Sequence, residues 1–146
     1  TRASERSMIL TDAGPLVALI DRGEADHSRC RSALESLTRP MLTTWPAFTE
    51  AIYLLGSAAG WLGEAALWRL LLRGDLELAA LNELMIKRSY ALMEQYRDVP
   101  MDLADATLVA VAEERSLTQI FTLDSDFQIY RLKGKRAIEP VPLPTA

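Results

Sequence analysis

Short apolar runs alternate with segments of helical pattern along most of this 146-residue chain. Strands that alternate with helices are typical of a parallel sheet, because a parallel crossover needs a helix-length connection. We therefore expect a single α/β domain over residues 8–141, built as an α/β/α sandwich with a central, mostly parallel sheet. The expected strands are residues 8–10, 41–44, 76–79, 119–123 and 137–141.

Capping residues and glycines indicate where the helices begin and end. Thr44, Asn82 and Asp102 each precede a helical pattern and can accept a backbone N–H from its first turn. Gly60 and Gly63 interrupt the apolar pattern that follows Thr44, so two helices are expected there. The expected helices are residues 15–21, 24–37, 45–57, 64–72, 83–96 and 103–115.

The two ends of the chain lack these patterns. Residues 1–7 are polar, and we expect a disordered N-terminus or residues added ahead of a native start at Met8. The proline-rich residues 142–146 are expected to form an extended tail. No apolar stretch reaches the roughly 18 uncharged residues of a membrane span, which predicts a cytoplasmic protein with no membrane partner.

Three carboxylates stand alone in apolar stretches of the sequence. Glu50 is the only charged residue among residues 40–63, and Asp12 is the only one among residues 7–20. Asp105 is followed by seven uncharged residues. A buried carboxylate is costly unless it is paired, protonated or bound to a metal. For Asp12 and Asp105 the alternative is a structural role, as a helix cap or as an acid in the first helical turn.

The stretch "FTLDSDF" places two more acids, Asp124 and Asp126, directly after an expected strand. Because the carboxyl ends of parallel strands meet at one edge of the sheet, these acids and Asp12 are expected to lie close together. Capping of a turn is the alternative for one member of the pair. Asp102 is expected to be mainly a helix N-cap, with a supporting place at the same site.

Carboxylates that cluster in a chain of net charge −4 need a counter-ion. Like charges at short range repel one another in a low dielectric unless a divalent cation lies among them. Oxygen-only ligation by Mg²⁺ or Mn²⁺ is expected, because the chain has one histidine, His27, and one cysteine, Cys30, three residues apart at an expected helix surface or boundary. Metal-bound water hydrolyses phosphodiesters without a nucleophilic side chain, and the sequence has no P-loop and no serine-nucleophile motif.

The negative net charge excludes a global attraction to nucleic acid, so a polyanion would have to be bound locally. A basic patch near the C-terminus is a weak candidate for RNA binding, with a solvated loop as the alternative. The patch consists of Arg131, Lys133, Lys135 and Arg136.

Four segments together resemble the acidic motifs of the PIN-domain family, in the same order and at similar separations: "ILTDAGPLVALID", "TTWPAFTEAIYLL", "DLADATLVAVAEE" and "IFTLDSDF". The short single-domain form is similar to the VapC-type toxins of bacterial toxin–antitoxin pairs. The resemblance implies a PIN-like sandwich and a Mg²⁺- or Mn²⁺-dependent ribonuclease. It also implies an RNA substrate, a homodimer, and a cognate antitoxin whose tail enters the acidic groove.

By position, the resemblance implies metal-binding and catalytic roles for four acids, Asp12, Glu50, Asp105 and Asp124. Asp126 matches a position that is often acidic and is a further expected metal ligand. Thr122 matches a hydroxyl residue commonly found close to the metal. Gly14 is a departure, because the family frequently has Ser or Thr at this position.

Two other interpretations stay open on the sequence. A PIN nuclease could process RNA or act on DNA without an antitoxin, or the fold could serve as a catalytically silent interaction module. The complete set of acids argues against the silent module. The apolar residues 54–62, with Trp61 and Trp68, could form a dimer or antitoxin surface, and core packing is the alternative.

Overall fold

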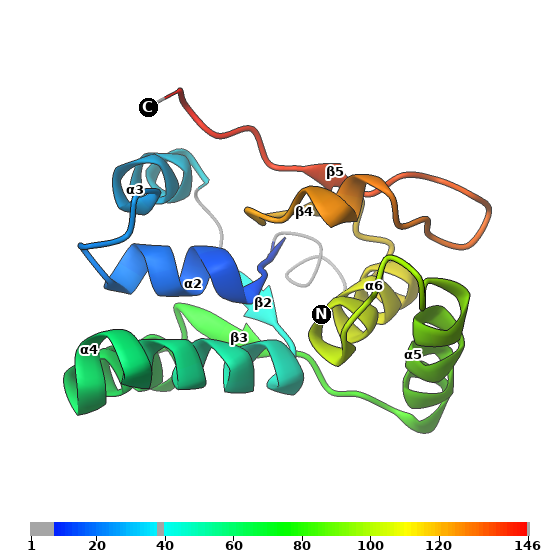
Figure 1. Ribbon diagram of the computed structural model, residues 1–146, viewed down its shortest axis with the longest axis horizontal. Coiled ribbons are helices and arrows are strands. Elements are labelled where there is room, and N and C mark those ends of the chain that lie inside the picture. Colours follow the sequence, from blue (N-terminus) through cyan, green and yellow to red (C-terminus); the bar gives the residue numbers. More distant parts are fainter. Residues whose placement is uncertain (1–7, 38–39, 146) are drawn as a thin grey trace.

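The computed structural model describes residues 8–37 and 40–145, and a parallel sheet of short strands runs through the middle of this part of the chain (Figure 1). The strands are β1 (Ile9–Leu10), β2 (Met41–Thr43), β3 (Leu76–Leu78), β4 (Gln119–Ile120) and β5 (Glu139–Pro140). β1, β2 and β3 pair in that order, β4 pairs with β5, and a parallel bridge between Thr11 and Phe121 joins the two sets. All of these pairings are parallel, as expected from the sequence. The expectation for residues 1–7 lies outside the described residues.

The helices begin where the capping residues predict. Thr44 accepts the N–H of Ala47, Asn82 accepts from Met85, and Asp102 accepts from Asp105. Each of these bonds satisfies a backbone donor that the first turn of a helix leaves free. The helices are α2 (Ala13–Ile20), α3 (His27–Ser36), α4 (Trp45–Arg73), α5 (Glu83–Gln95), α6 (Leu103–Arg115) and the 3₁₀ helix η1 (Ser125–Gln128).

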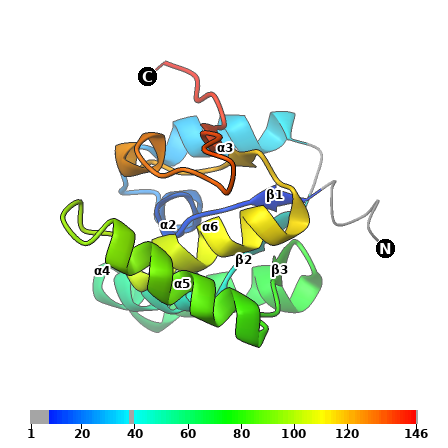
Figure 2. The ribbon, with the colours of Figure 1, turned by 90° about the vertical axis from the view of Figure 1, so that its right-hand side faces the viewer.

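Helices cover both faces of the sheet. Neighbouring residues of a strand point to opposite faces, so Ile9 packs in the cluster of α3 while Leu10 packs in the cluster of α5 and α6. In β2, Met41 packs in the cluster of α2 and α4, whereas Leu42 packs in the cluster of α5 and α6. Figures 1 and 2 show α5 and α6 side by side on one face, with α2, α3 and α4 on the other. The expected α/β/α sandwich is therefore confirmed.

The apolar helix α4 is more exposed than its sequence predicts. Tyr53, Leu54, Trp61 and Leu62 have 73%, 40%, 67% and 80% of their surface exposed. Core packing is therefore wrong for Leu54, Trp61 and Leu62, whereas Leu55 of the same segment is fully buried. Trp68 is half-buried and stacks edge-on against Phe48, with ring centroids 5.0 Å apart. The helices of the described residues do not combine the length and the hydropathy that a transmembrane segment needs.

Gly60 divides α4 into two arms, as expected, whereas Gly63 is an ordinary buried helical residue. Gly60 has φ 62° and ψ −155°, a conformation that residues with a Cβ rarely adopt. A Cβ at Gly60 would meet no atom within 4 Å, so the constraint comes from the backbone alone.

We expect Gly60→Ala to lower the free energy of unfolding by about 1–3 kcal/mol, because alanine is strained in this conformation. Gly74→Ala is the matched control, since Gly74 also has positive φ (84°) but lies in the left-handed helical region at a helix end. It is expected to cost less, about 1 kcal/mol. Urea unfolding of both variants measures the difference, and equal losses would show that the α4 bend does not depend on the Gly60 backbone.

Candidate active site

Five of the predicted acids line one pocket of about 420 Å³ beyond the carboxyl ends of β1 and β4. The other lining residues are Gly14, Leu54, Leu123 and Ser125, so no basic side chain from residues 8–37 or 40–145 lies in the pocket wall. The sequence brings these acids together from four separate segments, as the topology of a parallel sheet predicts. The five acids are Asp12, Glu50, Asp102, Asp105 and Asp124.

Asp12 is buried at the base of the pocket, where β1 passes into α2. Its Oδ1 accepts the N–H of Ala13 at 2.8 Å, and its Oδ2 accepts the Thr122 hydroxyl at 2.8 Å. Thr122 Oγ1 in turn accepts the N–H of Asp124 at 3.0 Å, so this threonine links the two acids. Burial raises the pKa of Asp12 from 3.8 to about 6, although both hydrogen bonds lower it.

Asp105 is buried in the first turn of α6, with 6% of its surface exposed. Its backbone N–H donates to the N-cap Asp102, and its Oδ2 accepts the hydroxyl of Tyr130 at 2.9 Å. Burial, followed by the charge of Asp102, raises the pKa of Asp105 from 3.8 to about 7, against the lowering effect of the Tyr130 bond. The sequence did not identify Tyr130, although a tyrosine in the apolar stretch after "DSDF" could have suggested a buried hydroxyl.

Glu50 is exposed, which corrects the expectation of a buried carboxylate on an apolar helix. It lines the acidic pocket from the first arm of α4, whose exposed face carries apolar residues as well. Desolvation, followed by the charges of Asp102, Asp12 and Asp124, raises the pKa of Glu50. The charges of the other pocket acids therefore act on the Glu50 carboxylate, although this side chain is in contact with solvent.

Asp124 and Asp126 have different positions in the structure. Asp124 lines the pocket and caps η1, with its Oδ1 accepting the N–H of Asp126 at 2.9 Å. Asp126 lies in the first turn of η1 and is not among the pocket-lining residues. The turn-capping role that the sequence left open for one of the pair thus belongs to Asp124, which is also the acid that faces the pocket.

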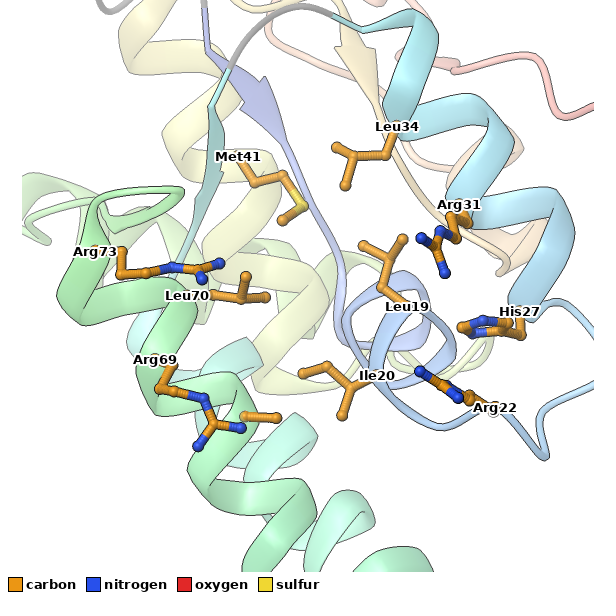
Figure 3. A pocket seen from close by; sticks show the side chains of 11 residues that line it. Leu19, Ile20, Arg22, His27, Arg31, Leu34, Met41, Arg69, Leu70 and Arg73 are labelled. Carbon is orange, nitrogen blue, oxygen red and sulfur yellow. The ribbon is translucent and has the colours of Figure 1, made fainter.

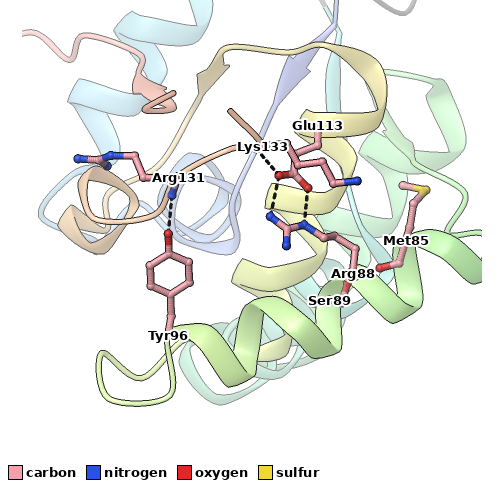
Figure 4. A network of polar contacts seen from close by, with 7 residues as sticks. All are labelled: Met85, Arg88, Ser89, Tyr96, Glu113, Arg131 and Lys133. Atoms are coloured by element: carbon pink, nitrogen blue, oxygen red, sulfur yellow. Dashed lines mark hydrogen bonds and ion pairs between the residues drawn. The ribbon is translucent and has the colours of Figure 1, made fainter. Parts of the chain in front are cut away.

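The predicted basic patch does not line the acidic pocket. The Arg131 guanidinium donates to the backbone carbonyls of Gln128, Ile129 and Tyr130, so it stabilises the end of η1. The backbone N–H of Lys133 donates to Glu113, which also pairs with Arg88 (Figure 4). Lys135 and Arg136 lie on the exposed loop that follows. An RNA-binding role for the patch stays a prediction.

A second pocket, of about 380 Å³, has the opposite charge (Figure 3). Arg22, Arg31, Arg69 and Arg73 surround an apolar floor that includes Leu19, Leu34 and Leu70. His27 lines this pocket and its Nδ1 lies 2.6 Å from the carbonyl oxygen of Ala18. The pocket contains none of the predicted site residues. Cys30 is fully buried rather than at a helix surface, and burial raises its pKa to about 11.

The acidic pocket fits a divalent cation by its donor chemistry. Its wall offers carboxylate oxygens without thiolate or imidazole, which is the ligand set that Mg²⁺ and Mn²⁺ prefer. Burial, followed by smaller effects of the neighbouring acids, disfavours the charged forms of Asp12 and Asp105 and raises their pKa values, and a bound cation would favour the charged forms again. In the present side-chain conformations, no group of three Asp, Glu, His or Cys residues in the described ranges is arranged to hold a metal ion.

The sequence profile of the PIN domain matches residues 9–133. The chain belongs to the PIN-domain family. This PIN domain is 28% identical to ribonuclease VapC26 of Mycobacterium tuberculosis over 116 residues, which cover 80% of this chain and 86% of that protein. The resemblance to VapC-type proteins that the sequence motifs indicate is confirmed.

Two crystal structures show the same fold as this PIN domain. One is Mycobacterium tuberculosis VapC20, described as a toxin that cleaves the Sarcin-Ricin loop, with a TM-score of 0.77 and 19% identity over 83% of this chain and 93% of that chain. The other is VapBC2 from Rickettsia felis bound to a DNA fragment from its promoter, with a TM-score of 0.65 and 11% identity over 94% and 99%. These similarities confirm the PIN-like sandwich.

Proposed function

We propose that this PIN domain is a divalent-metal-dependent endoribonuclease and the toxin of a type II toxin–antitoxin pair. The observation that carries the proposal is the convergence of five carboxylates, two of them buried, in one pocket without a basic residue. The similarity to ribonuclease VapC26 and to the toxin VapC20 supports the activity. A silent interaction module would have no use for buried acids whose pKa values are raised.

In this proposal Asp12, Glu50, Asp105 and Asp124 hold Mg²⁺ or Mn²⁺. A cation bound there would lower the pKa of a water molecule and neutralise charge that develops on the phosphodiester. Thr122 positions Asp12 through its hydroxyl and Asp124 through the backbone N–H. Asp102 supports the site as the cap of α6, and Asp126 supports it within η1 rather than as a ligand. Gly14 lines the pocket without a hydroxyl, although a Cβ there would make only ordinary contacts with Leu123 at 3.5 Å.

The proposed partners are RNA, a cognate antitoxin and a second copy of the chain, in the cytoplasm. The Rickettsia felis structure contains a VapBC assembly, which supports the antitoxin as a partner. The exposed apolar residues of α4 fit a protein interface, because monomeric proteins rarely expose large contiguous patches of apolar side chains. A PIN nuclease that processes RNA without an antitoxin is the second candidate, and the presence of a small neighbouring antitoxin gene separates the two.

Cleavage of a mixed single-stranded RNA pool tests the proposed reaction. We expect cleavage with Mg²⁺ or Mn²⁺, none with EDTA, and a loss of about 10- to 100-fold in Glu50→Gln, because the amide removes one metal-binding charge. Glu50 is exposed, and desolvation followed by the neighbouring acids raises its pKa, so the metal-free variant is expected to melt no lower than wild type. Glu83→Gln is the matched control, a change of the same charge at an exposed position outside the pocket.

Equal cleavage by the wild type and Glu50→Gln would remove Glu50 from the proposed site. Cleavage that persists in EDTA would contradict the metal-dependent reaction. Wild-type protein that binds Mn²⁺ but leaves the pool intact would point to a substrate absent from the pool. Failure to bind either metal would favour the interaction module.

A further inference from the structure

Tyr130 lies behind the acidic pocket, outside the motifs that predict the site. It follows η1 by two positions, and its side chain has 0% of its surface exposed. The ring packs edge-on against Phe127 and Tyr96, with centroids 5.2 Å away in both pairs. Because aromatic neighbours hold the ring on two sides, its hydroxyl has a fixed direction.

That hydroxyl donates to Oδ2 of Asp105 at 2.9 Å. A tyrosine hydroxyl has an ordinary pKa of about 10, so it carries a proton at neutral pH and can act as the donor to this carboxylate. No side chain in the described ranges donates to the other oxygen, Oδ1, which is left as the oxygen through which Asp105 can bind a ligand.

We propose that Tyr130 is a positioning residue that fixes the Asp105 carboxylate by holding Oδ2 and leaving Oδ1 for the metal, an inference that rests on the proposed function. Carboxylates that bind metals are commonly oriented by a hydrogen bond to a neighbouring group, and loss of such a bond weakens metal binding. The backbone of Asp105 is already fixed by its N–H bond to Asp102, so the Tyr130 bond acts on the remaining side-chain rotation.

Tyr130→Phe tests this role because it removes one oxygen atom and keeps the buried ring. We expect the Kd for Mn²⁺, measured by calorimetry on the full chain, to rise about tenfold. We expect kcat for RNA cleavage to fall while KM for RNA stays unchanged, because Tyr130 is fully buried and does not line the pocket. Urea unfolding verifies that the variant is folded.

Tyr96→Phe is the matched control. Tyr96 packs against the same ring. Its hydroxyl accepts the backbone N–H of Arg131 at 2.9 Å (Figure 4) and makes no hydrogen bond with Asp105. Its Mn²⁺ affinity and kcat are expected to stay within twofold of wild type. If loss of either hydroxyl only loosens this aromatic cluster, Mn²⁺ affinity and kcat would fall equally in both variants. That result would overturn the positioning role.

Mn²⁺ binding by the wild-type protein separates the proposed metal site from the role of Tyr130. Wild-type Mn²⁺ affinity and kcat in Tyr130→Phe would overturn the role of Tyr130 and leave the nuclease proposal intact. Absence of Mn²⁺ binding by the wild-type protein would overturn the metal site and the role of Tyr130 together.

Discussion

Asp105→Asn is expected to lower RNA cleavage by roughly 1,000-fold while it raises the stability of the metal-free protein at pH 8. Asparagine keeps the shape of the side chain and an oxygen that can accept the Tyr130 hydroxyl. It removes the negative charge that the proposed cation needs. Replacing a residue that stabilises the fold lowers the stability of the protein. Replacing a destabilising carboxylate that is kept for function raises it.

The pH dependence follows from the pKa of Asp105, which is about 7 in the fold against an ordinary 3.8. The folded protein binds this proton more tightly than the unfolded chain does. The stability that the group contributes is therefore complete below about pH 4 and is lost as the pH rises through about 7. After allowance for solvent in the pocket, we expect Asp105→Asn to melt about 3–8 °C higher than wild type at pH 8 in EDTA, with no such gain near pH 4.

Differential scanning fluorimetry between pH 4 and pH 8 measures the rise in melting temperature. The RNA cleavage assay with Mn²⁺ measures the loss of activity. Asp98→Asn is the matched control, since Asp98 is exposed in the turn after α5 and away from the pocket wall. It should change neither quantity. An Asp105→Asn protein that melts below wild type at pH 8 would show that Asp105 is a structural acid of the α6 first turn.

The parts of the fold that depend on neighbouring residues were predictable from the sequence. Thr44, Asn82 and Asp102 cap helices because a short polar side chain can reach the N–H groups of the next turn. The parallel order of the sheet followed from the alternation of strands and helices. Because that topology brings the strand ends to one edge, the meeting of Asp12 with Asp124 was predictable as well.

The parts that depend on tertiary packing were not predictable. The exposure of Glu50 depends on which side of α4 faces the sheet, and an apolar helix gives no clear period to decide this. The bond between Tyr130 and Asp105 joins residues 25 positions apart. Arg131 was expected in a basic surface patch, but its guanidinium binds carbonyl groups at the end of η1, a contact that requires the fold of η1 itself.

The largest expected loss of stability comes from Glu113, which joins three segments at the C-terminal end of α6. Its carboxylate has 7% of its surface exposed and accepts two hydrogen bonds from Arg88 of α5, at 2.8 and 3.0 Å. It also accepts the backbone N–H of Lys133 at 2.6 Å (Figure 4). We expect Glu113→Ala to lower the free energy of unfolding by about 2–4 kcal/mol, because it leaves a half-buried guanidinium and a backbone N–H without their acceptor.

Glu114→Ala is the control for Glu113→Ala, since Glu114 is the next residue of α6 and is exposed. This substitution is expected to lower the free energy of unfolding by less than about 0.5 kcal/mol. Urea unfolding measures both losses, and hydrogen exchange locates them. Lys133 follows Tyr130 by three residues, so release of its N–H should speed amide exchange in residues 131–136 more than in α2 or α3. Exchange that accelerates evenly through the protein would mean that Glu113 stabilises the fold as a whole and does not hold this loop in particular. A loop-specific effect would make Glu113 the anchor of the segment that carries Tyr130 to Asp105.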